Sequence, residues 1–310
     1  MPPRSKKRKA TELGHNEMER LLDGLDSIKS QLEELKVEEG GEFEAELTSL
    51  IEKYRRKLEP VHTSFSEVSD RLLESLDITR SESLHTKDPQ ATIARSRNAG
   101  ATHLMSPDTF HKFLLFLDQH VVSDPEASAR IWIDVFMYRL IALTAEAQPQ
   151  QRLLLRLDHP IPEVQFAESP TSQTVGGFVD YVAFLVEERD AAEIVEDSGF
   201  VNPNVQGMPV IEAKAITAVL HTHIPRAVAE IAACAKTQGR HTLRGALTNG
   251  KAWYFLVFTW NNDFKGGSYK QCLLINNDNY GPAFIASVLH RWLAGCFLDI
   301  GDEDEDFRVI

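Results

Sequence analysis

The sequence lacks three features that would assign it to a membrane, secreted or zinc-ribbon class. No stretch of the 310 residues reaches the roughly 18 consecutive apolar positions of a membrane-spanning helix, so we expect no membrane association. The first residues contain no apolar signal core, so we do not expect secretion by that route. The three cysteines, Cys234, Cys272 and Cys296, lie far apart and form no C-x-x-C pair, which argues against a zinc site or a disulfide framework. We expect reduced cysteines in a cytosolic or nuclear protein.

The chain also lacks an excess of positive charge. It has 33 Lys and Arg against 46 Asp and Glu, a net charge of −13, which argues against tight non-specific binding to nucleic acid. Part of such a deficit is expected where carboxylates gather around a cation. With 310 residues and 43% hydrophobic content, the chain suits one globular domain with extensions or two small domains.

A basic block stands near the start of the chain. Residues 1–15 predict a disordered basic N-terminus that contains the run from Lys6 to Lys9. Such a run is typical of a nuclear localisation signal or a nucleic-acid contact, and a merely disordered start is the alternative. We expect a nuclear protein on this ground, and otherwise a cytoplasmic one.

Residues 16–78 carry apolar positions at helical spacing. A second run extends from Leu47 to Leu76 with Pro60 inside it, and a proline kinks or divides a helix. The pattern predicts a helical coiled-coil arm whose apolar stripes need a partner, either the other helix in a hairpin or a second chain in a homodimer. The spacing fits both arrangements. The first run recurs three and four positions apart: Met18, Leu21, Leu25, Ile28, Leu32 and Leu35.

The rest of the chain divides into a linker, a domain and a tail. Residues 79–105 are polar and aperiodic and predict a linker. Residues 106–300 predict an α/β domain with a central mixed sheet and helices on both sides. Within it, the turn Thr248-Asn249-Gly250 lies between two apolar runs and predicts a β-hairpin. The acidic residues 301–310 predict a disordered tail.

Two short apolar runs of this domain carry charged groups. The run GGFVDYVAF contains Asp180, and the run MPVIEAK ends in Glu212, Ala213 and Lys214. Both runs predict strands, and residues two apart on a strand face the same way, so Glu212 and Lys214 share a face. A buried charge without a partner is costly, so we expect Asp180 to lie on the neighbouring strand and converge with them. Two carboxylates can hold a hard divalent cation, and a lysine can activate what binds to it.

This arrangement resembles the PD-(D/E)XK nuclease superfamily, the fold of restriction endonucleases. The resemblance covers roughly residues 124–258, in the order helix, strand, strand with Asp180, strand with Glu212-x-Lys214, helix and strand. It implies an enzyme that hydrolyses the phosphodiester bonds of nucleic acid, with DNA favoured over RNA as the substrate.

The resemblance also implies roles for individual residues. Asp180, Glu212 and the backbone carbonyl of Ala213 would hold Mg²⁺ or Mn²⁺. Lys214 would orient or deprotonate the attacking water. Glu126 resembles a family glutamate at the start of the first core helix that supports the metal through water, and an ordinary acidic residue in the first helical turn is the alternative.

Other residues compete with this assignment or depart from the family pattern. Many members carry a glutamine on the helix that follows the lysine, whereas this chain has Glu230 at a similar place. Asp158 and Glu163 are competing carboxylates, but the prolines around them favour loop positions. His221 and His223 are two residues apart but have too few neighbouring ligands for a histidine metal site.

Two other functions stay open at this level. In the first, the nuclease-like domain is inactive, and the protein is a nuclear interaction module that works through its helical arm. The missing glutamine and the acidic charge favour it. In the second, the protein is a purely structural coiled coil, which leaves the Glu-x-Lys strand unexplained.

Overall fold

The fold was analysed in a computed structural model, which describes residues 15–35, 41–58, 61–122, 125–167, 173–196 and 210–310. The chain divides into two units, residues 1–63 with 165–175 and residues 64–164 with 176–310. The predicted nuclear signal from Lys6 to Lys9 lies outside the described residues. None of the described helices is long and apolar enough to cross a membrane.

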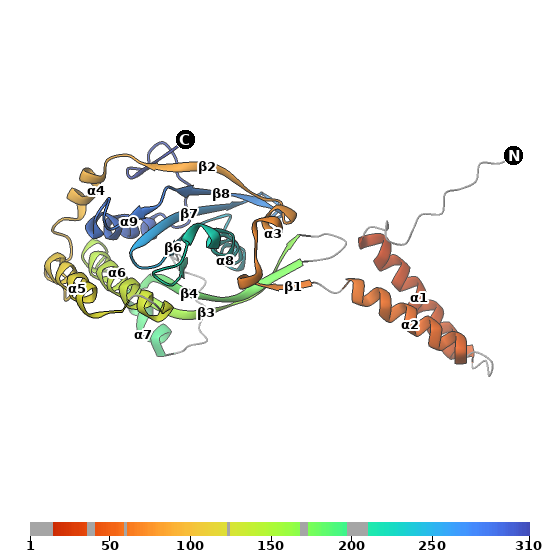
Figure 1. The fold of residues 1–310 in the computed structure, drawn as a ribbon. Coiled ribbons are helices and arrows are strands. Elements are labelled where there is room, and N and C mark those ends of the chain that lie inside the picture. Colours follow the sequence, from red (N-terminus) through yellow and green to blue (C-terminus); the bar gives the residue numbers. More distant parts are fainter. Residues whose placement is uncertain (1–14, 36–40, 59–60, 123–124, 168–172, 197–209) are drawn as a thin grey trace. The chain divides into compact units, whose positions relative to one another are not determined.

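The first unit contains a helical hairpin of α1 (His15–Leu35) and α2 (Gly41–Leu58) (Figure 1). Its apolar positions meet inside the hairpin, and Arg55 Nη2 forms an ion pair with Asp26 Oδ2 at 2.7 Å. The second helix ends two residues before Pro60, so residues 61–78 do not continue the helical arm predicted over 16–78. Those residues instead form β1 (Val61–Ser64), a 3-10 turn η2 (Phe65–Glu67) and α3 (Asp70–Ser75). The hairpin buries Leu22, Leu47 and Ile51, with Leu25, Leu32 and Tyr54 packed against them.

A mixed sheet forms the centre of the second unit, which confirms the prediction of an α/β fold. The strand order is β4-β5-β6-β7-β8-β2-β10, with β3 beside β4 and β9 beside β7. The β5–β6 and β2–β8 pairs are parallel, and the β4–β5, β6–β7, β7–β8 and β2–β10 pairs are antiparallel. The strands are β2 (Ile78–Thr86), β3 (Gln151–Ala167), β4 (Gln173–Glu187), β5 (Val210–Ala213), β6 (Thr242–Thr248), β7 (Ala252–Trp260), β8 (Gly267–Cys272), β9 (Ile275–Asn276) and β10 (Phe307–Val309).

Helices cover both faces of this sheet (Figure 1). On β7, alternate residues from Trp253 to Val257 join the core formed with α5 (Pro107–His120), α6 (Glu126–Ala147) and α9 (Pro282–Ala294). The residues between them point to the other face of the sheet, toward α8 (Ile224–Thr237). There the Trp260 indole N–H donates to the Ala232 carbonyl of that helix at 3.0 Å. Helix α6 is apolar on most sides, as expected for a helix buried between the sheet and its neighbours. Helices α4 (Pro89–Ser96) and α7 (Glu188–Glu196) complete the described set.

The predicted hairpin at Thr248-Asn249-Gly250 is confirmed. Strands β6 and β7 pair antiparallel around it, with Thr248 opposite Trp253. Gly250 has a φ of +82°, and a Cβ atom there would lie 2.5 Å from the Cβ of Trp132 on α6. Glycine therefore serves both the turn conformation and the close packing of the turn against the helix.

The predicted linker and disordered tail both belong to the sheet. Residues 79–105 contain most of β2 and all of α4, and the tail forms β10, antiparallel to β2. Strand β2 buries Ile78 and Leu84 and leaves a polar surface, so its sequence lacks the alternation that marks a strand. Phe307 is fully buried against Phe255 and Trp292, which anchors the tail.

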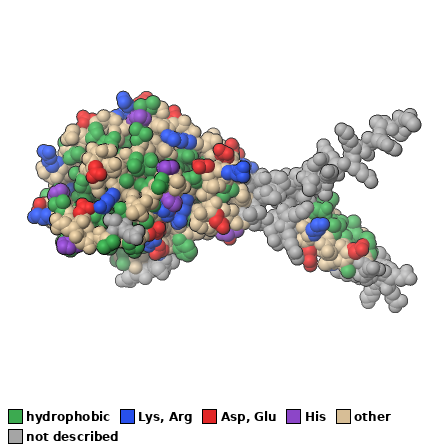
Figure 2. Space-filling model, in the orientation of Figure 1, with side chains coloured by type: hydrophobic (Ala, Val, Ile, Leu, Met, Phe, Trp, Pro, Cys, Tyr) green, Lys and Arg blue, Asp and Glu red, His purple; other side chains and the backbone are tan. Residues whose placement is uncertain are grey.

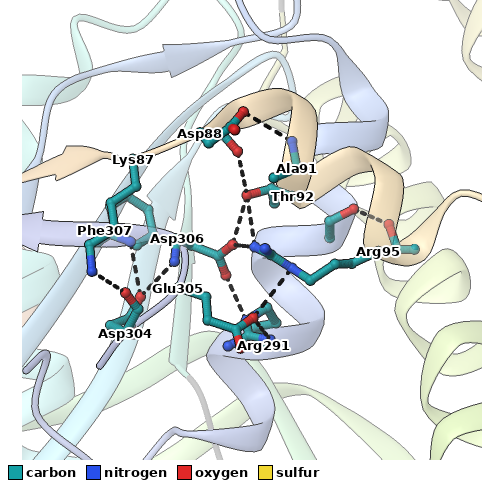
Figure 3. Close-up of polar contacts among 12 residues, drawn as sticks. Lys87, Asp88, Ala91, Thr92, Arg95, Arg291, Asp304, Glu305, Asp306 and Phe307 are labelled. Carbon is teal, nitrogen blue, oxygen red and sulfur yellow. Dashed lines mark hydrogen bonds and ion pairs between the residues drawn. The ribbon is translucent and has the colours of Figure 1, made fainter. Parts of the chain in front are cut away.

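Ion pairs hold the tail beside β2 and α9 (Figure 3). The carboxylate of Asp306 is paired with Arg95 of α4 and, at 2.8 Å, with Nε of Arg291 of α9. Its Oδ1 also accepts a hydrogen bond of 2.7 Å from the Thr92 hydroxyl. The acidic tail is ordered because its charges are matched by arginines that the sequence places far away.

Candidate catalytic site

The pairing of β4 with β5 brings the predicted carboxylates together. Tyr181 lies opposite Ile211 and Val182 opposite Val210, so the same antiparallel register places Asp180 opposite Glu212. Residues directly opposite on an antiparallel pair point to the same face. Strand β5 also pairs with the central β6, which holds Glu212 in the interior of the sheet.

Asp180 is fixed through both of its oxygens. Its Oδ2 accepts a hydrogen bond of 2.8 Å from the backbone N–H of Ala213, which ties β4 to the Glu-x-Lys segment. Its Oδ1 pairs with Nη2 of Arg130 on α6 at 2.5 Å. The other arm of that guanidinium, Nη1, reaches Oδ1 of Asp158 at 3.1 Å. Asp158 therefore lies on β3 beside the site rather than in the loop that its flanking prolines suggest.

Glu212 is fully buried and receives two cations on one oxygen. The ammonium of Lys214 pairs with Oε1 of Glu212 and also donates to the Ala213 carbonyl at 2.8 Å. Arg226 of α8 contacts the same Oε1 through Nε at 2.7 Å. The Nε of Arg226 also lies 2.9 Å from Oε1 of Glu230, four residues further along α8. Glu212 and Lys214 thus share a face, as predicted.

Two of the three carboxylates, Glu212 and Glu230, have a raised pKa. Burial raises the pKa of Glu212, and the negative charges of Glu230 and Asp180 raise it further, against the opposing effect of Lys214 and Arg226. Burial also raises the pKa of Glu230, opposed by its hydrogen bond to Glu212 and by Arg226. Proximity to Glu212 and Glu230 outweighs burial at Arg226, whose pKa is raised. The site therefore favours an additional proton or cation.

Two buried oxygens of this carboxylate cluster have no hydrogen-bond partner within the described part of the chain. They are Oε2 of Glu212 and Oε2 of Glu230. Buried polar atoms are nearly always partnered, so each such atom requires an explanation. The charge of Glu230 raises the pKa of Glu212, so a proton or a cation beside these two oxygens would be favoured.

Glu126 stands apart from this cluster. It is the first residue of α6 and is exposed. Among the described residues, no hydrogen bond or ion pair joins it to Asp180 or Glu212. Its carboxylate acts on His223, where it opposes the lowering of the histidine pKa by burial, Lys214 and Arg226. Glu126 thus lies on the rim of the site, and a contact to it would require a bridging group.

Sequence reasoning missed Arg130 and Arg226. Arg226 had a local signal, because it stands four residues before Glu230 on a predicted helix, where opposite charges pair. Arg130 had none, since its contacts with Asp180 and Asp158 depend on how α6 packs against β3 and β4.

The donor set fits a hard divalent cation. Asp180, Glu212 and the Ala213 carbonyl offer the oxygen ligands that Mg²⁺ and Mn²⁺ prefer, and the unpartnered Oε2 of Glu212 is a free ligand atom. Within the described residues, no group of three or more His, Cys, Asp or Glu side chains is arranged to hold a metal. A cation here would therefore be held by two carboxylates and a carbonyl.

Comparisons with known proteins add no family. A scan against models of protein families gives no match, and a search of the curated proteins finds no similar sequence.

Proposed function

We propose that the second unit hydrolyses phosphodiester bonds of nucleic acid with a divalent metal ion, in the manner of the PD-(D/E)XK superfamily. One observation carries this proposal: Asp180 and the Glu212-x-Lys214 segment lie on adjacent antiparallel strands and are joined by the 2.8 Å bond between Asp180 Oδ2 and the Ala213 N–H. Apart from α7 between β4 and β5 and a 3-10 turn before α8, the element order α6-β3-β4-β5-α8-β6 follows the order that the resemblance implies, which supports the proposal.

Each residue has a role that follows from its present contacts. Asp180 and Glu212 would hold Mg²⁺ or Mn²⁺ together with the Ala213 carbonyl, and the ion supplies a polarised phosphate and a more acidic bound water. Lys214 is buried beside both ligands and would orient the attacking water and stabilise charge that develops on the phosphate. Glu126 would act from the rim through a water molecule. We propose DNA as the substrate ahead of RNA.

A cleavage assay tests the proposal. Single- and double-stranded DNA and RNA are incubated with the full chain and Mg²⁺ or Mn²⁺, beside Asp180→Asn as an isosteric control. We expect metal-dependent cleavage of at least one substrate by the wild type and none by the variant. No cleavage of any of these substrates, or equal cleavage by both proteins, contradicts the proposal.

A second candidate function is an inactive interaction module. It is favoured by the charge balance of the site, since Arg130, Lys214 and Arg226 already face Asp180, Glu212 and Glu230. On the face shown in Figure 2, basic side chains are interspersed with acidic ones, and the described residues there form no continuous basic stripe. Absence of both metal binding and cleavage in the wild type would favour this candidate.

We propose that the helical arm pairs with a second copy of the chain. The hairpin leaves Leu21, Ile28, Phe43 and Leu50 exposed, and a coiled-coil dimer would cover them. Sedimentation of the full chain should give a dimer that Ile28→Glu with Leu50→Glu dissociates. A monomeric wild type contradicts this assignment.

Nuclear localisation is a separate proposal that rests on the Lys6 to Lys9 block. Alanine at these four positions should redistribute a tagged protein from the nucleus to the cytoplasm. An unchanged distribution contradicts it.

A further inference from the structure

Arg130 occupies the one oxygen of Asp180 that faces away from the protein backbone. Oδ2 is committed to the Ala213 N–H at 2.8 Å, which orients the carboxylate. Oδ1 is the oxygen left for a cation, and Nη2 of Arg130 lies 2.5 Å from it. A metal ion bound by Asp180 would therefore take the position that the guanidinium now uses.

Arg130 also has a second anchor that does not depend on Asp180. Its Nη1 lies 3.1 Å from Oδ1 of Asp158, a residue on β3 whose side chain is 63% exposed. The side chain of Arg130 is itself 32% exposed, whereas Asp180 is only 7% exposed. The guanidinium thus lies between a buried carboxylate and a solvent-facing one, at the outer edge of the site. Asp158 has a φ of +48°, an uncommon left-handed conformation within a strand.

Arg226 differs from Arg130 in the burial of its partners. Its Nε lies between two fully buried carboxylates, Glu212 and Glu230, and Glu230 is on its own helix. Arg226 therefore neutralises interior charge, whereas one partner of Arg130, Asp158, faces solvent.

We propose that Arg130 is a substrate-contacting residue that exchanges partners. Before metal binds, it holds Oδ1 of Asp180. With a metal at that oxygen, Arg130 keeps its bond to Asp158 and turns the rest of its guanidinium to a non-bridging oxygen of the phosphodiester. The planar fork of arginine matches two oxygens of one phosphate, which an ammonium does not. This inference rests on the proposed function, since it requires the metal and the phosphodiester.

The exchange predicts opposite effects on metal binding and on cleavage. Arg130→Gln should tighten Mn²⁺ binding by roughly five- to tenfold, because an ion pair with Asp180 no longer has to be broken. The same variant should lower kcat/KM by about 10²- to 10³-fold, the loss typical of one removed charge-stabilising donor. A purely structural role for Arg130 would weaken both.

Calorimetric titration with Mn²⁺, beside the cleavage assay, measures the two effects. Arg152→Gln is the charge-matched control, because Arg152 pairs with Glu188 at the start of β3 and should leave both readouts unchanged. Arg130→Lys keeps the charge without the fork and should restore part of the cleavage but not all of it. Unfolding by urea checks that each variant is folded.

The outcomes separate the inference from the function on which it rests. A wild type that binds Mn²⁺ and cuts, with Arg130→Gln binding Mn²⁺ equally or more weakly, overturns the exchange and leaves the function standing. Cleavage by Arg130→Gln at the wild-type rate also overturns the exchange and leaves the function standing. A wild type that neither binds Mn²⁺ nor cuts overturns the function and the exchange together.

Discussion

The second unit contains two clusters of three carboxylates and three cationic side chains, and they differ in how their acidic groups are satisfied. The tail cluster consists of Asp304, Glu305 and Asp306 with Arg95, Arg244 and Arg291. Figure 3 labels all of these residues except Arg244. The strand cluster consists of Asp180, Glu212 and Glu230 with Arg130, Lys214 and Arg226.

The tail cluster matches each buried oxygen with a donor. Asp306 is 3% exposed, and its two oxygens take Thr92, Arg95 and Arg291. Oδ1 of Asp304 accepts backbone N–H groups of Asp306 and Phe307 at 3.0 and 2.9 Å. Such complete pairing closes the C-terminal strand onto the domain, and it leaves no oxygen that requires another cation.

The strand cluster instead keeps two buried oxygens without a partner among the described residues, and two of its carboxylates have a raised pKa. Burial raises the pKa of Glu212 and of Glu230, and the charge of Asp180 adds to both shifts despite three nearby cations. Groups perturbed by burial and like charge are enriched in functional sites. The comparison therefore favours a structural role for the tail cluster and supports the proposed chemical role of the strand cluster.

Lys214→Ala should give the largest effect, because it removes a cation from the strand cluster without removing a metal ligand. Cleavage should fall by about 10²- to 10⁴-fold, the range for a positioned proton-transfer group. Mn²⁺ binding should stay within a few-fold of wild type. Lys112→Ala is the control, because Lys112 pairs with Asp108 on the exposed face of α5. Cleavage by Lys214→Ala at the wild-type rate would remove the lysine from the mechanism.

Asp306→Asn should have the next largest effect, on stability alone. It leaves the arginines that face Asp306 without their buried carboxylate, so the free energy of unfolding should fall by about 1–3 kcal/mol in urea. Asp108→Asn breaks an exposed pair and should cost less than about 0.5 kcal/mol. Equal decreases in the free energy of unfolding of the two variants, or weaker Mn²⁺ binding by Asp306→Asn, would contradict the division into a structural and a chemical cluster.

Glu230→Gln should give the smallest effect, a change in pH dependence. The pKa of Glu230 is raised in the folded chain above its ordinary value of 4.5, so the folded state holds a proton that the unfolded state releases. The free energy of unfolding therefore decreases as the pH rises above about 4.5, and the variant lacks this decrease.

Urea unfolding at pH 5 and pH 8 measures the difference. Relative to wild type, Glu230→Gln should gain on the order of 1 kcal/mol at pH 8 compared with pH 5. Glu188→Gln, at the exposed pair with Arg152, should show no such change. A gain that is larger at pH 5 would mean that Glu230 is stabilised as an anion.

The elements that the sequence predicted are those with a local signal. The apolar run around Asp180, the Glu212-x-Lys214 run and the Asn249-Gly250 turn each carry their own pattern, and each forms the predicted strand or hairpin. The register that joins Asp180 to Ala213 follows from pairing apolar faces, so the convergence of these residues was predictable.

The elements that the sequence did not predict depend on contacts over long distances. Strand β2 is polar because most of its side chains are exposed or half-buried, and only Ile78 and Leu84 are buried. The acidic sequence of the tail predicts disorder, because the arginines that pair with it, Arg95 and Arg291, belong to other elements. Arg130 reaches Asp180 only because the N-terminal part of α6 lies beside β4. Ion pairs between elements that are far apart in the sequence produce no periodic pattern from which they could be predicted.

Titration of the full chain with Mn²⁺ in a calorimeter, beside Asp180→Asn, tests the central claim most directly. The account predicts saturable binding to the wild type, and weakening by more than about tenfold in the variant, since even groups outside the ligand shell contribute that much. The asparagine keeps the shape of Asp180 and an oxygen for the Ala213 N–H, so the fold should be unchanged. Absence of Mn²⁺ binding by the wild type, or equal binding by both proteins, would contradict a metal site between β4 and β5.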